Sequence, residues 1–98
     1  MLYAMNWSIK TENRHTVFER FANADLSQET PAGLRIKGRY HSIGDFTGVM
    51  VFEADNEAAI FKWLLLWNDL VDVEYKPVVE DAEAQEIGKE FLRSQNRG

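Results

Sequence analysis

Alternation between bulky apolar and smaller or polar residues marks four stretches of the chain as strands. Residues 2–9 (LYAMNWSI) and 34–41 (LRIKGRYH) alternate with a period of two, as does the run 46–54 (FTGVMVFEA) after a short loop. This period is typical of a strand with one buried face. A fourth strand is expected at residues 71–79 (VDVEYKPVV), where Pro77 cannot donate a ladder hydrogen bond and therefore favours an edge position.

Two stretches between these strands have helical spacing, and a third closes the chain. Residues 14–24 place apolar side chains one turn apart among charges, which predicts a helix that buries one face. Asp55 begins the second helix, residues 55–70, and we expect its carboxylate to cap the first turn. This helix is apolar around most of its circumference, so more than one neighbour must cover it. Residues 80–98 form the last helix. Its apolar stripe consists of Ala84, Ile87, Phe91 and Leu92.

The order of elements, β-α-β-β-α-β plus a helix, predicts a ferredoxin-like α+β fold in a single domain, residues 1–98. In this topology the strands, numbered along the chain, lie in the order 4-1-3-2, and the helices cover one face of the sheet. The opposite face then stays open. The residues expected on the open face are Asn6, Ser8, Arg35, Lys37, Arg39, His41, Thr47, Val49, Val51, Glu53, Glu74 and Lys76.

Composition narrows the classes of function. A chain of 98 residues that is 45% hydrophobic is near the small end of self-sufficient domains, and a partner subunit would help it bury its aromatic residues. The formal charge of −5 disfavours nucleic acid as a partner. The sequence has no Cys, which fits a reducing compartment, and no run long enough to cross a bilayer or to act as a signal peptide. We therefore expect a cytoplasmic protein without a membrane partner.

Motifs that bind cofactors are missing from the sequence. It contains no glycine-rich dinucleotide loop, no phosphate-binding loop and no arrangement that activates a Ser or Cys nucleophile. The two His residues do not favour a metal site, because His15 is expected on the outer side of the first helix, away from His41. We expect neither a metal nor a cofactor.

Several local strings resemble a known family. They are NWSI followed by ENR, GRYH before the hairpin, EAD ahead of a helix that ends WLLLWNDL, and KPVVED after the fourth strand. Together they are similar to a group of short bacterial proteins catalogued only as a domain of unknown function. The resemblance covers residues 2 to about 92, and the string GR[W/Y]H together with W-x-x-x-W-N-D-L is its most specific part.

The resemblance implies an assembly as well as a fold. The family is placed among the dimeric α/β barrels, in which two ferredoxin-like subunits put their open sheet faces together around a shared cavity. Members of this superfamily include cofactor-free oxygenases, isomerases, haem enzymes and proteins with no known activity, so the fold leaves the chemistry open. The haem-degrading members resemble this chain at Asn6, but the Trp late in their third strand and the His after their second helix are not matched here.

Arg39 and His41 are the first candidates for a functional site, because residues two apart on a strand share a face. A guanidinium can clamp a carboxylate with two hydrogen bonds, and an imidazole can transfer a proton near neutral pH. The alternative is structural: His41 would bond the neighbouring loop, and Arg39 would pair with Glu53 or Glu74 across the sheet. Positive charge on an edge strand also protects against aggregation. The sequence leaves both interpretations open.

Other polar and aromatic residues have a structural alternative too. Asn6 and Ser8 could orient a ligand on the same open face, or simply bond to each other or to water. Trp63 and Trp67, spaced i and i+4 on a helix, are typical of a core or an interface rather than of a cofactor site. Trp7 could stack on a ligand, but its alternation with other apolar residues favours core packing.

Three functions follow from these candidates. The first is a homodimer that binds a small anionic or aromatic organic molecule between its sheets. The second is a cofactor-free oxygenase- or isomerase-like enzyme, in which His41 acts as general base and Arg39 stabilises the resulting anion. The third is a structural or partner-docking dimer whose cavity is filled by its own side chains. The residues expected to contact a ligand are Arg39, His41, Asn6, Ser8, Glu53 and Glu74.

Overall fold

The structure, a computed structural model, describes residues 1–25 and 28–96 and contains one four-stranded antiparallel sheet. The sheet order is β2-β3-β1-β4, which confirms the predicted order and puts Pro77 in an edge strand. The strands are β1 (Leu2–Ile9), β2 (Leu34–His41), β3 (Thr47–Ala54) and β4 (Val71–Pro77).

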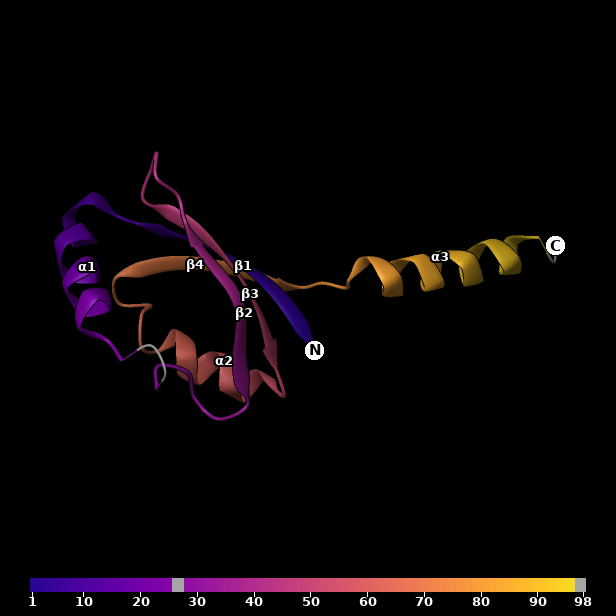
Figure 1. The fold of residues 1–98 in the computed structure, drawn as a ribbon, viewed down its shortest axis with the longest axis horizontal. Coiled ribbons are helices and arrows are strands. Elements are labelled where there is room, and N and C mark those ends of the chain that lie inside the picture. The colour runs from indigo at the N-terminus through magenta and orange to yellow at the C-terminus, as the bar shows by residue number, and fades with distance from the viewer. Residues whose placement is uncertain (26–27, 97–98) are drawn as a thin grey trace.

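Two helices cover one face of this sheet. The short 3-10 turn η1 (Thr11–Asn13) leads into α1 (Arg14–Asn23), and α2 (Glu57–Leu64) follows β3. Figure 1 shows α1 and α2 together on one side of the strands, as the ferredoxin-like topology requires. The predicted class, α+β with the order β-α-β-β-α-β, is therefore confirmed.

The second helix is shorter at both ends than the predicted range of residues 55–70. It begins at Glu57 and ends at Leu64. Asn56 is its cap, because the Asn56 side chain accepts a hydrogen bond from the Ala59 backbone N–H at 2.9 Å. The expectation that Asp55 caps the helix is wrong, since this carboxylate instead accepts from Arg35 at 2.9 Å. The helix ends at Leu64, and residues 65–70 continue as tight turns instead of a further helical turn.

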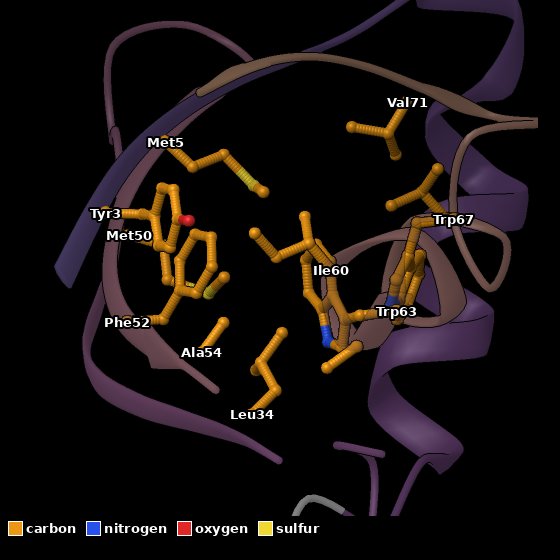
Figure 2. Packing of buried hydrophobic residues seen from close by; sticks show 12 residues of the cluster. Tyr3, Met5, Leu34, Met50, Phe52, Ala54, Ile60, Trp63, Trp67 and Val71 are labelled. Atoms are coloured by element: carbon orange, nitrogen blue, oxygen red, sulfur yellow. The ribbon is translucent and has the colours of Figure 1, made fainter. Parts of the chain in front are cut away.

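The core lies between the sheet and the two covering helices. Side chains of β1 and β3 face α2, and Figure 2 shows Met5 and Phe52 on the sheet side opposite Ile60 and Trp63. Met50 and Phe52 are completely buried. Trp63 and Trp67 are buried members of this cluster, which confirms the core interpretation of both. Trp7 is half-buried against the same cluster.

A β-bulge in β2 changes which residues face the helices. The register pairs Ile36 with Phe52, and after the irregularity between Ile36 and Gly38 it pairs Arg39 with Met50. Because directly paired residues share a face of the sheet, Arg39 lies on the same side as the buried Met50. The extra residue of the bulge reverses the alternation, since two residues of β2 oppose one of β3.

Arg39 and His41 therefore lie on the helix side, and the expectation that they belong to the open face is wrong. His41 is paired with Gly48, itself paired with Trp7, and its ring contacts the Trp7 ring. Tyr40 takes the open side, paired with Val49. The register places nine other predicted residues on the open face: Asn6, Ser8, Arg35, Thr47, Val49, Val51, Glu53, Glu74 and Lys76. Lys37, at the bulge, reaches Glu53 on the same face with its Nζ at 3.2 Å.

The last helix, α3 (Asp81–Gln95), does not join the core. None of its residues is buried, and Figure 1 shows it projecting from the end of β4 on the side of the sheet opposite α1 and α2. The predicted helix and its apolar stripe are present, but Ile87, Phe91 and Leu92 are each more than half exposed. The predicted range extends to residue 98, of which 97–98 lie outside the described residues.

Within residues 1–25 and 28–96, every helix falls short of the length and apolar character that crossing a membrane requires.

Candidate functional site

An aromatic cavity lies between the helix layer and the sheet. Its volume is about 50 Å³, which corresponds to a few water molecules. Apart from Arg39 and His41, every lining side chain is aromatic or aliphatic. The lining residues are Trp7, Ile9, Val17, Phe18, Phe21, Arg39, His41, Trp63, Trp67, Val71 and Val73.

Arg39 is held in the wall of this cavity by Glu29. The two guanidinium nitrogens Nη1 and Nη2 donate to the Glu29 carboxylate at 3.0 and 2.9 Å, and the Arg39 guanidinium also lies over the Phe21 ring at 5.2 Å. The side chain of Glu29 is only 4% exposed, and that of Arg39 14%. Trp67 Nε1 donates to the same carboxylate at 3.2 Å. The charge of Arg39 is thus matched within the protein by a nearly buried carboxylate, and the pair joins the loop before β2 to the cavity wall.

His41 lies between two rings of the cavity. Its imidazole is 5.3 Å from the Trp7 ring centroid in an edge contact and 5.1 Å from that of Phe21. The residue is nevertheless exposed, at the end of β2. Its ring can therefore contact both a molecule in the cavity and solvent, which is the position a proton-transferring group needs.

The open face of the sheet carries a second, broader hollow of about 670 Å³. Asn6, Ser8 and Glu74 line it, and Asn6 is directly paired with Glu74 across β1 and β4. Thr47 and Val49 of β3 also line this hollow. It is wide and is lined by both polar and apolar side chains, in contrast to the narrow aromatic cavity.

Glu53 lies outside this hollow, in an ion-pair cluster at the other end of the open face. Lys37 Nζ is 3.2 Å and Arg35 Nη2 3.4 Å from its carboxylate, and Arg35 also donates to Asp55. The hydrogen bond and charge of Lys37, followed by those of Arg35, hold the pKa of Glu53 below its ordinary value. The hydrogen bond and charge of Arg35 likewise lower the pKa of Asp55.

The candidate residues thus lie in three places, two of which His41 joins. Arg39 and His41 share the aromatic cavity, and His41 also lines the open-face hollow with Asn6, Ser8 and Glu74. Glu53 belongs to the surface cluster. His15, at 93% side-chain exposure, lies beside Glu19 on the outer side of α1, as predicted.

The sequence interpretation missed Glu29 and Phe21 as neighbours of Arg39. One local signal was available, because a Gly inside a strand pattern often marks a bulge, and Gly38 lies at the irregularity that turns Arg39 inward. No comparable signal connects Glu29, in a loop, with Arg39, ten residues further along the chain.

The antiparallel sheet, its order β2-β3-β1-β4 and the two helices on one face define a ferredoxin-like α+β domain. The sequence profile of a family described as "Domain of unknown function (DUF3303)" matches residues 1–92, and the chain belongs to this family. That assignment confirms the resemblance drawn from the local strings.

A solved structure supports the fold independently. The crystal structure of a "putative antibiotic biosynthesis monooxygenase" from Deinococcus radiodurans is similar with a TM-score of 0.50. The likeness covers 82% of this chain and 94% of that chain, at 10% sequence identity, and it therefore bears on the fold alone. A comparison with curated proteins finds no match.

Proposed function

We propose that the protein binds a small aromatic molecule in the cavity between the helices and the sheet, with His41 as its polar contact. The observation that carries this proposal is the composition of the cavity wall, where five aromatic side chains and His41 converge. Aromatic walls with few polar groups are typical of sites for small organic ligands. The site differs from the predicted one, which was to lie between two sheets.

The state of Arg39 favours a neutral ligand over an anionic one. Both of its terminal nitrogens already bind Glu29, and a ligand carboxylate would have to displace a nearly buried side chain. His41 has no such partner among the hydrogen bonds of the described residues, so it is the group that a ligand hydroxyl can meet. A phenol fits both requirements.

The size of the cavity limits the ligand to one ring. At about 50 Å³ it is roughly a third of an apolar cavity known to hold benzene, so the cavity itself must enlarge to hold one ring. Phe18 and His41 line the cavity and are exposed, and they are the side chains free to move.

Titration with 4-nitrophenol tests this proposal through the protein's own fluorescence. All three Trp residues of the chain line the cavity, so a ligand that enters must change their emission. We expect saturable quenching that weakens about three- to tenfold in His41→Leu, because the leucine side chain cannot hydrogen-bond the ligand hydroxyl. His15→Leu removes the only other His, which lies outside the cavity, and should bind like the wild type. Quenching that does not saturate, or that both variants weaken equally, contradicts the proposal.

The contact of His41 with both the cavity and solvent favours a second candidate function, cofactor-free catalysis in which His41 removes a proton from the bound molecule. A base that can pass its proton to water can act repeatedly. The visible absorption of bound 4-nitrophenolate distinguishes this function from binding alone. We expect the ionised fraction of the bound phenol to exceed that of the free phenol, and His41→Gln to abolish the difference. A phenol that binds without becoming more ionised excludes His41 as its base.

A further inference from the structure

We propose that α3 is an arm that packs its apolar stripe against the outer face of α2 in a second copy of this chain. The inference is independent of the ligand proposed for the aromatic cavity. The contact would join two apolar surfaces that each remain uncovered, one on α3 and one on α2.

The first surface is the stripe of α3. Ala84, Ile87 and Phe91 recur at helical spacing, and the exposed fractions of Ile87 and Phe91 are 52% and 60%. No residue of α3 is buried. A helix of 15 residues is marginally stable alone in water, so α3 needs a packing partner for this stripe.

The second surface is the outer face of α2 and the turn that follows it. Ala59, Ile60 and Trp63 face the core, whereas Phe61 and Leu65 lie on the opposite side with exposed fractions of 60% and 55%. The sequence predicts that more than one neighbour covers this helix, and the sheet covers only its inner side. Phe61 and Leu65 are spaced i and i+4, like Ile87 and Phe91, which suits helix-to-helix packing through i±4 ridges.

The occupant of each surface is a second copy rather than the same chain. Figure 1 shows α3 leaving the sheet on its open side, pointing away from α2, which lies on the other side of the sheet. Only residues 78–80 connect β4 to α3, too short a link for the arm to turn back around the sheet. A two-fold axis lets each copy offer its α3 and receive that of its partner, which closes the assembly.

Charge supports one orientation of this pairing. Glu83 and Glu90 flank Ile87 on one side of the α3 stripe. On α2, Lys62 adjoins Phe61, whereas Glu57 lies one turn before Phe61 on the same outer face. The pairing therefore sets the acidic edge of α3 beside Lys62 and away from Glu57.

Sedimentation velocity of the full chain tests the proposal first. We expect a species of twice the 11.3 kDa chain mass, and a rise of at least tenfold in its dissociation constant in Ile87→Glu and in Phe61→Glu. Ala82→Glu adds the same charge on the polar side of α3 and should dimerise like the wild type. A wild-type monomer overturns the proposal, as does a dimer that neither Ile87→Glu nor Phe61→Glu weakens.

A spin label then locates the contact. The chain has no Cys, so Ser94→Cys provides a single attachment site on α3. The labelled variant is mixed with unlabelled, ¹⁵N-enriched wild type, and only contacts between copies broaden the observed signals. We expect broadening at the amides of Phe61 and Leu65. Broadening confined to other surfaces overturns the assignment of α2 as the receiving face, even if the protein is a dimer.

Discussion

Single residues decide how the wall of the aromatic cavity is held. Glu29, in the loop before β2, balances the charge of Arg39 and also accepts a hydrogen bond from Trp67 Nε1. One carboxylate therefore holds two side chains of the cavity wall in place. Replacement of this carboxylate by an amide leaves a guanidinium in a nearly buried position without its counter-charge. The charge pair therefore offers a direct test of how this wall is held.

Glu29→Gln should lower the free energy of unfolding by about 3 kcal/mol, because the remaining partner of a buried ion pair is left uncompensated. Urea denaturation followed by Trp emission measures the change. Asp69→Asn breaks the Arg20–Asp69 pair, whose side chains are 39% and 58% exposed, and should have little effect. Equal effects of the two substitutions would show that Glu29 is not a buried counter-charge.

Gly48 keeps space for the Trp7 ring. A Cβ at this position would overlap the ring of Trp7, which lies directly opposite across β1 and β3. Gly48→Ala should therefore displace Trp7, shift Trp emission to longer wavelength and destabilise the fold by about 1–3 kcal/mol. At Gly44 a Cβ meets nothing within 4 Å, and Gly44→Ala serves as the control. An unshifted emission spectrum in Gly48→Ala would contradict the crowding argument.

Arg35 controls the titration of Asp55. In Arg35→Gln the hydrogen bond and the charge that lower the Asp55 pKa are both lost, so the pKa should rise toward its ordinary value of 3.8. A lowered pKa contributes stability above the ordinary value, and that contribution is lost as the pH falls through the folded-state pKa. The variant should consequently lose less stability on acidification.

Titration of the carboxyl ¹³C signals by NMR measures the Asp55 pKa directly. Lys37→Gln is the matched control, since Lys37 is the main cause of the lowered Glu53 pKa and does not contribute to that of Asp55. The Arg35 assignment fails if both variants leave the Asp55 pKa unchanged.

At the scale of elements, local patterns predicted the strands and helices well because each has its own period. Residues 2–9 and 34–41 match β1 and β2 in full. The patterns failed where the backbone departs from a regular period. At Gly38 the bulge inverted the faces of the following residues, and a strict alternation cannot represent an extra residue. Arg39 and His41 were therefore predicted on the wrong side of the sheet, although the two do share one face.

The cap of α2 is a second feature that the sequence pattern misplaced, in this case by one residue. Asp55 and Asn56 are both good capping residues, and their order alone does not decide which one is used. Arg35, twenty residues away in the sequence, binds Asp55 and leaves the cap to Asn56. Only the tertiary fold contains that information.

Asn56→Ala should lower the free energy of unfolding by about 1 kcal/mol through loss of the cap. Thermal denaturation followed by circular dichroism measures it. Asn56→Asp retains a capping oxygen and should restore the stability. A loss in Asn56→Ala that Asn56→Asp does not recover would assign the effect to something other than the cap.

For the whole molecule, the fold and the family could be predicted from the sequence, but the position of α3 could not. The amphipathic pattern of α3 indicates that its apolar stripe packs against another surface. The pattern does not say whether that surface belongs to the same chain or to another one. With the stripe packed against a second copy, as proposed above, the stability of the helix depends on concentration.

Dilution should therefore unfold α3 while the sheet stays intact. We expect the ellipticity at 222 nm to fall as the protein is diluted below the dissociation constant of the dimer, because a lone helix of this length is marginal. The Trp emission, which reports the cavity, should not change over the same range. Ellipticity that is independent of concentration at all dilutions would show that α3 is stable without a partner.

The bulge in β2 also divides one strand into two parts that can vary separately. Before it, Arg35 and Lys37 contribute to the charge of the outer surface, and after it, Arg39 and His41 contribute to the interior. Substitutions of Arg35 or Lys37 can therefore tune the charge of the outer surface without reaching the cavity wall. Substitutions of Arg39 can change the cavity wall and leave the ion pairs of Arg35 and Lys37 in place.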